Sequence, residues 1–258
     1  MAALNVFGLD GQIVIVTGAG KGIGRGIAVD AAASGATVIG CSRTESDLDS
    51  LRAEIEELGT GSCATLATDI SSVDGLQDLY AFTMREFGRF DSVVNNAGVN
   101  VLKDAIDYTE EEVDSLFSLN LKAVYWSSVV AARHMIKAGT QGSILNITSQ
   151  AAVAGAPGRA PYSAAKAGVN HLSRTLAAEW AKHGIRVNAL APTVTATPLG
   201  IRAMEMRPEL AEEVSRRIAL RGRAALVEEI TRPAIFLLSP AASLITGQTL
   251  VVDGGWTL

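Results

Sequence analysis

The chain has 258 residues, of which 48% are hydrophobic, and a net charge of −5 from 22 basic and 27 acidic side chains. This length and composition suffice for one large core, so we expect a single domain over residues 1–258. No block of basic residues is present, which argues against nucleic acid as a partner. The sequence has no run of eighteen apolar residues and no basic-then-apolar signal pattern at its start, so we expect no membrane association and a cytoplasmic location.

Cysteine and histidine are too few and too scattered to indicate a disulfide framework or a metal site. Cys41 and Cys63 lie in predicted strands that can be neighbours in a sheet, and buried free thiols are favoured over a disulfide in a reducing compartment. The histidines, His134, His171 and His183, show no ligand spacing. We therefore expect no metal.

Predicted strands and helices alternate along the whole chain. Short runs rich in β-branched residues indicate buried parallel strands, and the longer segments between them have helical spacing. Right-handed crossovers turn such a series into an α/β fold, a doubly wound parallel sheet of about seven strands with helices on both faces. The expected strands are 12–17, 37–42, 62–67, 91–95, 142–147, 186–191 and 249–252. The expected helices are 23–34, 44–58, 72–87, 109–138, 161–183 and 227–238.

A glycine-rich turn follows the first strand. Its spacing is Gly18-x-x-x-Gly22-x-Gly24, and a helix begins at Ile23. Free N–H groups and the helix dipole make the amino end of a helix attractive to anions, and glycines let a backbone approach a pyrophosphate closely. The turn alone is a weak signal, but its place between a strand and a helix predicts a nucleotide site.

The segment 193–223 fits none of these elements. It is polar and contains Pro198 and Pro208. We expect a short helical lid over the carboxyl ends of the strands, where ligands of this architecture bind.

Tyr162 and Lys166 are four residues apart on a predicted helix, and Ser149 lies thirteen residues before the tyrosine. Positions i and i+4 share a helix face. A nearby cation favours the phenolate, so we expect Lys166 to lower the pKa of Tyr162 and enable proton exchange with an alcohol or ketone. The pair alone also fits an ordinary amphipathic helix with a solvated lysine.

The motifs taken together resemble those of the short-chain dehydrogenase/reductase family, from about Leu9 to Trp256. Seven motifs occur in the family's order with family-like separations. They are Thr17-Gly18-x-x-x-Gly22-x-Gly24, Asp69-Ile70, Asn95-Asn96-Ala97-Gly98, Asn120, Ser149, Tyr162-x-x-x-Lys166 and Val252-Asp253-Gly254-Gly255.

The resemblance implies four catalytic residues. Tyr162 would be the general acid–base, and Lys166 would lower its pKa and bind the nicotinamide ribose. Ser149 would hold the substrate carbonyl oxygen, and Asn120 would bind a water that resupplies protons through Lys166. A fold that had lost catalysis and only senses nucleotides is the alternative of another class, but it predicts erosion at these positions and all four are intact.

The resemblance also implies a nicotinamide cofactor and its contacts. One departure from the family pattern is Thr193, where glycine usually follows the proline. The contacts expected by resemblance are Gly18, Lys21, Gly22, Ile23 and Gly24 at the pyrophosphate and ribose, Asp69 and Ile70 at the adenine, Asn96 and Gly98 on the adenosine side, and Thr195 and Thr197 at the carboxamide.

The choice between NADP and NAD is a question of charge. A cofactor without the 2′-phosphate is usually held by an acidic residue at the end of the second strand. This chain has Ser42 and Arg43 there and Lys21 in the glycine turn. Two cations and no carboxylate favour NADP, with NAD as the alternative if Arg43 only stacks on the adenine.

The substrate is the least determined part of the site. The Pro-Thr-Val-Thr stretch at 192–195 is similar to that of xylulose reductases, which favours a small polar ketone, sugar or polyol contacted by Gln150, Val153 and Arg159. The alternative is a 3-oxoacyl chain on acyl carrier protein. Reductases of that kind tend to carry an arginine where this chain has Ala178, although Arg133 remains on a neighbouring helix.

The helices 109–138 and 161–183 each have an apolar face wider than one sheet needs. Family members pair these helices across a two-fold axis, so we expect a homotetramer, with a dimer as the alternative.

Overall fold

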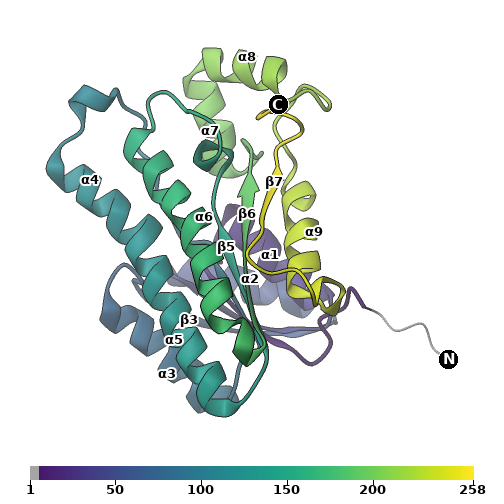
Figure 1. Ribbon diagram of the computed structural model, residues 1–258. Coiled ribbons are helices and arrows are strands. Elements are labelled where there is room, and N and C mark those ends of the chain that lie inside the picture. Colours follow the sequence, from purple (N-terminus) through teal and green to yellow (C-terminus); the bar gives the residue numbers. More distant parts are fainter. Residues whose placement is uncertain (1–5) are drawn as a thin grey trace.

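The computed structural model describes residues 6–258, and within this range seven parallel strands form one sheet in the order β3-β2-β1-β4-β5-β6-β7 (Figure 1). The predicted doubly wound α/β architecture is confirmed, and each predicted strand is observed within one residue of its expected ends. The strands are β1 (Ile13–Thr17), β2 (Thr37–Ser42), β3 (Ser62–Ala67), β4 (Ser92–Asn95), β5 (Gly142–Ile147), β6 (Ile185–Pro192) and β7 (Thr249–Val252).

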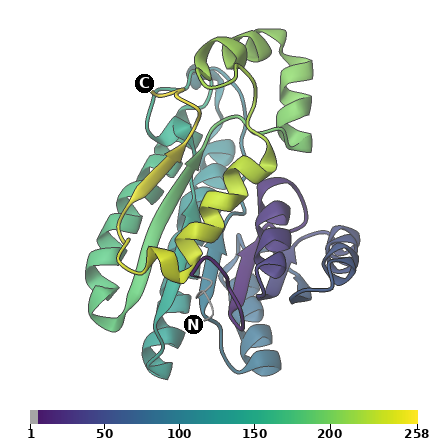
Figure 2. The ribbon, with the colours of Figure 1, turned by 90° about the vertical axis from the view of Figure 1, so that its right-hand side faces the viewer.

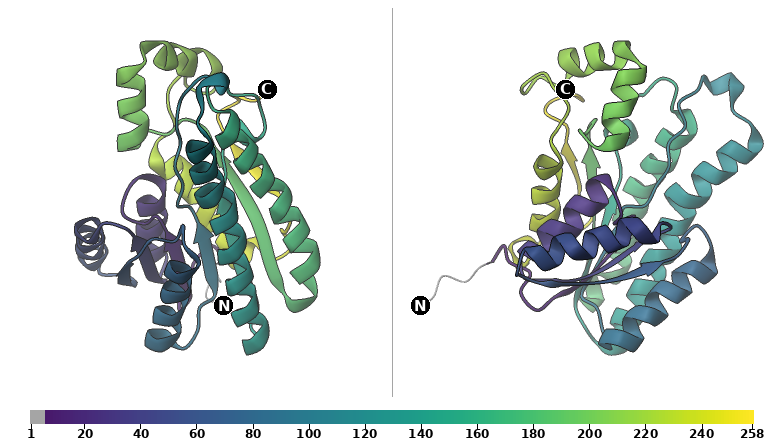
Figure 3. Two further views of the ribbon diagram at one scale, coloured as in Figure 1. Left: turned by 90° about the vertical axis from the view of Figure 1, so that its left-hand side faces the viewer. Right: turned by 180° about the vertical axis from the view of Figure 1, so that it is seen from behind.

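Helices cover both faces of the sheet (Figure 3). Two apolar clusters lie between the sheet and the helices, one on each face. One face is covered by α1 (Gly22–Ala33), α2 (Glu45–Glu57) and α9 (Val227–Leu238), and the other by α3 (Val73–Phe87), α5 (Ala123–Ala138) and α6 (Ala160–Trp180). No helix within residues 6–258 is long and apolar enough to cross a membrane.

The predicted helix over 109–138 is not continuous. The structure has α4 (Glu110–Phe117), a π-helical turn (Ser118–Lys122) and then α5. The side-chain amide of Asn120, at the centre of the turn, donates to the carbonyl oxygens of Leu116 at 3.0 Å and Val99 at 2.8 Å. An insertion that widens the helix is typical of functional positions.

Buried amides and hydroxyls join β4, β5, α5 and α6 beneath the carboxyl end of the sheet. Asn95 donates to Asn146 at 2.8 Å and to Ser128 at 3.1 Å, and it accepts from Ser127 at 2.6 Å. Asn146 in turn donates to Ser173 on α6 at 2.9 Å. Because unpaired buried polar groups are costly, this network favours one relative position of the two helices.

The segment that the sequence leaves unassigned contains α7 (Pro198–Met206) and α8 (Pro208–Arg217). Both helices lie at the carboxyl end of the sheet, near the C-terminus (Figure 2). Leu210 and Val214 of α8 are buried in a small cluster that also contains Trp256, and the guanidinium of Arg217 lies 4.8 Å from the centre of the Trp256 ring. The chain end therefore anchors α8.

Candidate active site

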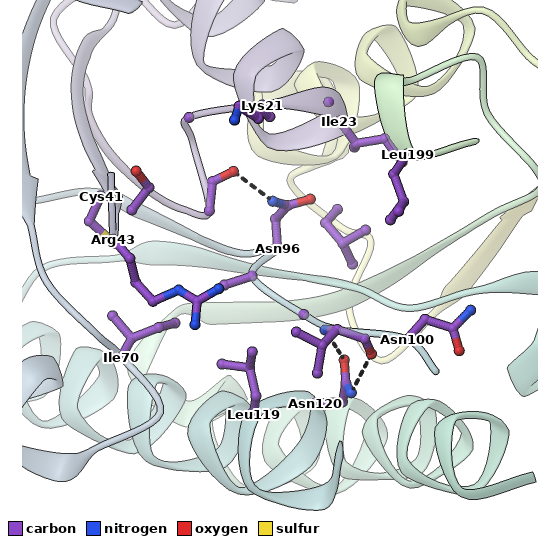
Figure 4. Close-up of a pocket in the computed structure, with 18 of the residues that line it drawn as sticks. Lys21, Ile23, Cys41, Arg43, Ile70, Asn96, Asn100, Leu119, Asn120 and Leu199 are labelled. Carbon is purple, nitrogen blue, oxygen red and sulfur yellow. Dashed lines mark hydrogen bonds between the residues drawn. The ribbon is translucent and has the colours of Figure 1, made fainter. Parts of the chain in front are cut away.

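A cleft of about 540 Å³ runs along the carboxyl ends of the central strands (Figure 4). It lies where the strand order changes direction, because β1 pairs with β2 on one side and with β4 on the other. Ligands of open α/β sheets bind at such a switch point. The cleft is the candidate cofactor site.

The glycine turn forms one wall of the cleft. Gly18 and Gly22 have positive φ angles of 67° and 60°, a conformation that costs other residues free energy. A Cβ atom on Gly24 would overlap the Gly18 carbonyl oxygen and the side-chain amide of Asn96. Gly24 therefore allows α1 to pack under the turn, whereas Gly18, Lys21, Gly22 and Ile23 line the cleft itself.

Asn96 connects the glycine turn to the end of β4. Its side-chain amide donates to the carbonyl oxygens of Thr17 at 3.0 Å and Gly18 at 3.3 Å (Figure 4). The Thr17 hydroxyl accepts from the backbone of Asn96 and Ala97. These bonds hold the turn in a defined position before any ligand binds.

The predicted adenosine contacts gather at one end of the cleft. Arg43 extends into it near Ile70 (Figure 4), and Ser42 and Asp69 also line this end. Asp69 accepts from the backbone N–H of Ser71 at 3.0 Å, and this bond lowers the pKa of its carboxyl below the usual range. Asp69 is therefore a carboxylate acceptor over a wide pH range.

Asp47 was not identified from the sequence. It lines the cleft, and its carboxylate forms an ion pair with Lys21 at 3.1 Å. A carboxylate is thus present near Ser42. The expectation of two cations and no carboxylate at this end of the cleft is wrong. Asp47 belongs to the first turn of α2 and to no motif, so only the packing of α2 against the glycine turn reveals it.

Lys166 is 3% exposed, and its ammonium donates to the carbonyl oxygen of Ile147 at 2.9 Å. Burial lowers the pKa of Lys166 from 10.5 to about 8. The ammonium also lies 5.9 Å from the centre of the Tyr162 ring. Lysine and tyrosine therefore share one end of the cleft, as the spacing predicts.

The pKa of Tyr162 is raised, contrary to the prediction. Burial disfavours the phenolate, and the hydrogen bond with Ser149 and the positive charge of Arg159 oppose this effect only in part. The Lys166 ammonium donates to the carbonyl oxygen of Ile147, and the raised pKa of Tyr162 shows that burial outweighs the charges around the phenol.

Ser149 is buried directly beyond β5 and starts the helical turn at 150–152, where its hydroxyl accepts from the backbone of Ala151 at 3.2 Å. The structure therefore places the Ser149 hydroxyl close enough to Tyr162 to act on its phenol, although only the tyrosine lines the cleft.

Asn120 lines the cleft beside Gly98. Its carboxamide oxygen accepts from the backbone of Val99 at 3.2 Å, so the side chain holds the loop after β4 against the π-helical turn. A Cβ atom on Gly98 would lie 2.6 Å from that oxygen and 3.5 Å from the Lys166 nitrogen. The absent side chain at 98 leaves space beside Lys166.

The two threonines expected at the carboxamide lie in different places. Thr197 lines the cleft and caps α7 by accepting from Gly200 at 3.1 Å. Thr195 is 5% exposed and outside the cleft, and its hydroxyl donates to the Thr193 carbonyl at 2.9 Å. Thr193 has no positive φ, so the backbone here does not require the family's glycine.

The expected substrate residues lie beside the cleft. Gln150 and Arg159 line a second pocket of about 190 Å³, whereas Val153 is 50% exposed and lines neither space. Both cysteines are free, and burial raises the pKa of the Cys41 thiol to about 12.

Comparisons with known proteins show the family of the chain. Residues 18–257 match a family model described as "Enoyl-(Acyl carrier protein) reductase". The chain is 36% identical to the 2-dehydro-3-deoxy-D-gluconate 5-dehydrogenase of Escherichia coli K12, covering 98% of each chain. It is 40% identical to the L-xylulose reductase of Bos taurus, covering 96% of this chain and 97% of the relative.

A solved structure with the same fold is a candidate NAD(P)-dependent gluconate 5-dehydrogenase from Beutenbergia cavernae with bound NADP at low occupancy. It has a TM-score of 0.90 and 37% identity, covering 97% of this chain and 98% of that one. Its identity and coverage, with those of the two relatives, exceed what a shared fold alone requires. The chain belongs to the short-chain dehydrogenase/reductase family and is a nicotinamide-dependent oxidoreductase.

Proposed function

We propose that this oxidoreductase interconverts a hydroxyl and a carbonyl on a small polyhydroxylated molecule, with NADP as the preferred cofactor. The observation that carries the proposal is the position of Tyr162. It lies at one end of the cleft beside Lys166, the Ser149 hydroxyl acts on its phenol, and a second pocket with an amide and a guanidinium is adjacent.

The residues support a simple proton and hydride balance. When bound, the cofactor supplies a hydride to the carbonyl carbon or accepts one from the alcohol carbon. Tyr162 gives its phenolic proton to the carbonyl oxygen during reduction and takes it back during oxidation. Ser149 holds that oxygen and stabilises the negative charge that develops on it.

Lys166 completes the proton path. A lysine with a pKa of about 8 exchanges protons readily near neutral pH, and its cationic form stabilises the phenolate of Tyr162. Asn120 holds the adjacent loop and the widened helical turn, and we propose that this turn provides the water path to Lys166.

The cleft fits a dinucleotide. Its glycine wall has free backbone N–H groups at the start of α1 and lacks the Cβ atoms that would block a pyrophosphate. Gly18, Gly22 and Ile23 would surround the pyrophosphate, and Thr197 would meet the carboxamide. Asp69, Ile70, Asn96 and Gly98 would contact the adenosine side.

The preference for NADP rests on Arg43. Its guanidinium extends into the adenosine end of the cleft (Figure 4), where a 2′-phosphate can accept from it. The bound NADP of the Beutenbergia cavernae protein agrees with this preference. The negative charge of Asp47 would repel a 2′-phosphate and so disfavour NADP. Lys21 offsets this repulsion by pairing with the Asp47 carboxylate.

The relatives favour a sugar-like substrate, because one is named for a deoxygluconate and another for L-xylulose. A 3-oxoacyl chain on acyl carrier protein is less favoured, since Ala178 is exposed where such reductases carry an arginine. We also propose that residues 1–258 are one domain, that α7 and α8 act as the lid, and that α5 and α6 pair in a homotetramer. The cytoplasmic location stays a prediction.

The proposal is tested by following NADPH absorbance while the purified chain meets xylulose, xylitol, gluconate and acetoacetyl-acyl carrier protein. Turnover of a sugar-like compound with NADP(H) at least tenfold better than with NAD(H) is expected. Turnover of the acyl substrate alone contradicts the proposed substrate class, and equal use of both cofactors contradicts the role of Arg43.

A further inference from the structure

The second pocket lies between three segments that meet beyond the carboxyl end of the sheet. The loop from Gln150 to Arg159, the helix α8 and Trp256 near the chain end all line it. With a volume of about 190 Å³, the pocket suits a small molecule.

The charges that line this pocket do not balance. Arg207 pairs with Glu209 at 3.1 Å, and Arg217 pairs with Glu213 at 3.1 Å. Arg159 has no carboxylate within 4.0 Å among residues 6–258 and donates no side-chain hydrogen bond to them. One positive charge therefore remains on the wall of the pocket, and partly buried charges are unfavourable unless paired.

A second polar group in the pocket also lacks a partner. Gln150 is 4% exposed, and its carboxamide oxygen is buried without a hydrogen bond. The oxygen itself is not exposed, so a ligand hydroxyl can donate to it once the Gln150 side chain turns toward the pocket that it lines. An amide that accepts and a guanidinium that donates suit a molecule with both hydroxyl and anionic oxygens.

Both groups are tied closely to the reacting residues. Gln150 follows Ser149 directly, and Arg159 precedes Tyr162 by three residues at the amino end of α6. The charge of Arg159 acts on the Tyr162 phenol, so the two lie within electrostatic reach. The dipole of α6 adds a partial positive charge at this end of the helix.

We propose that Arg159 binds a carboxylate of the substrate, so that the enzyme selects sugar acids over uncharged polyols. This inference rests on the proposed function and specifies its substrate class. A guanidinium binds a carboxylate through two parallel hydrogen bonds, which fixes orientation as well as charge. A carboxylate also matches the single unpaired cation better than a doubly charged phosphate does, because Glu209 and Glu213 lie in the same pocket.

The test compares D-gluconate with D-glucitol, which has CH₂OH in place of the carboxylate. Steady-state oxidation is measured with NADP⁺ for wild type, Arg159→Gln, Arg159→Lys and the control Arg174→Gln. Arg174 is exposed further along α6. Arg159→Gln should raise KM for gluconate about 10- to 100-fold, in line with a lost charge-assisted bond, and leave KM for glucitol within twofold.

Further results separate this inference from the proposed function. Arg159→Lys should recover part of the loss, Arg174→Gln should match wild type, and NADPH affinity should be equal in all variants. Equal effects of Arg159→Gln on gluconate and glucitol, or wild-type preference for glucitol, overturn the carboxylate site while the proposed function stands.

If wild type oxidises neither gluconate nor glucitol, the proposed function is wrong for these two compounds. Calorimetric titration of gluconate into the NADP⁺ complex then decides the carboxylate site by itself. Binding to wild type that is weakened at least tenfold in Arg159→Gln supports the site, and binding that is equal or absent overturns it.

Discussion

Lys21 in the glycine turn and Asp47 on α2 form an ion pair of 3.1 Å at the adenosine end of the cleft. Their side chains are 70% and 23% exposed, so the pair contributes little to stability. Its consequence concerns the cofactor, because the lysine reduces the repulsion between the Asp47 carboxylate and a 2′-phosphate.

Replacing Asp47 with asparagine should therefore shift selectivity toward NADPH. Removing one partly exposed negative charge is expected to raise the ratio of NADPH to NADH affinity about two- to fivefold. Fluorescence titration at low ionic strength measures the ratio, and added salt should reduce the change. Glu45→Gln, also in the first turn of α2, is the control. A shift toward NADH would mean that Asp47 does not face the phosphate.

Tyr162→Phe should remove turnover without removing cofactor binding. Loss of a general acid–base costs about 10²- to 10⁴-fold in kcat, and the ring stays in place because only the hydroxyl is deleted. Activity assays and NADPH titration on the same preparation separate the two effects. Unchanged activity would point to another proton donor, and absence of activity in wild type would favour the nucleotide-sensing alternative.

Burial of Lys166 should make stability depend on pH. Its pKa falls from 10.5 to about 8 on folding, so the unfolded chain binds more protons between these values. The free energy of unfolding should therefore rise with pH in this window, and the unfavourable contribution is complete below pH 8. The thiols of the buried Cys41 and the half-buried Cys63 act in the opposite direction above pH 9, because folding raises the pKa of both.

Urea unfolding from pH 7 to pH 9 isolates the contribution of Lys166. In Lys166→Met the free energy of unfolding should no longer rise with pH. In Lys137→Met, at the exposed end of α5, it should rise as in wild type. Parallel curves for wild type and Lys166→Met would show that this ammonium is not the titrating group.

Gly24→Ala should destabilise the chain although alanine is the better helix former. The gain in helix propensity is about 1 kcal/mol. The new methyl group would overlap the Gly18 carbonyl oxygen and Asn96, and overpacking against backbone typically costs about 1–3 kcal/mol. We therefore expect a lower free energy of unfolding and weaker NADPH binding.

The control for Gly24→Ala is Gly155→Ala, because a Cβ atom at 155 meets nothing within 4 Å. Its urea midpoint should stay close to that of wild type. Equal stability of wild type and Gly24→Ala would mean that the turn relaxes without loss.

The sequence predicts the sheet well because buried parallel strands are short, continuous apolar runs between glycines and helices. It does not predict the interruption at Asn120, since the residues around it have helical spacing and only the bonds from Asn120 to Val99 and Leu116 explain the wider turn. In the segment 193–223, α8 buries one side against the chain end, but the helix is short and only Leu210 and Val214 are buried on it, which is too little apolar pattern to assign it from the sequence.

The catalytic residues are easier to predict than their energetics. The spacing from Tyr162 to Lys166 is enough to place both at one end of the cleft. The direction of the Tyr162 pKa shift depends on burial, which Ser149 and Arg159 oppose only in part, and burial is not encoded in spacing. Asp47 and the position of Thr195 likewise depend on how distant segments pack.

The buried amide and hydroxyl network around Asn95 and Asn146 positions the proposed catalytic residues independently of the residues that are proposed to select the substrate. It fixes α5 and α6 from within the core, so the positions of Tyr162 and Lys166 on α6 are set there and not by the loops of the second pocket. The residues proposed to contact the substrate come instead from the segment after β5, in a pocket that α8 also lines. Evolution can thus alter these loops and change which alcohol is oxidised, while the reaction itself is inherited unchanged.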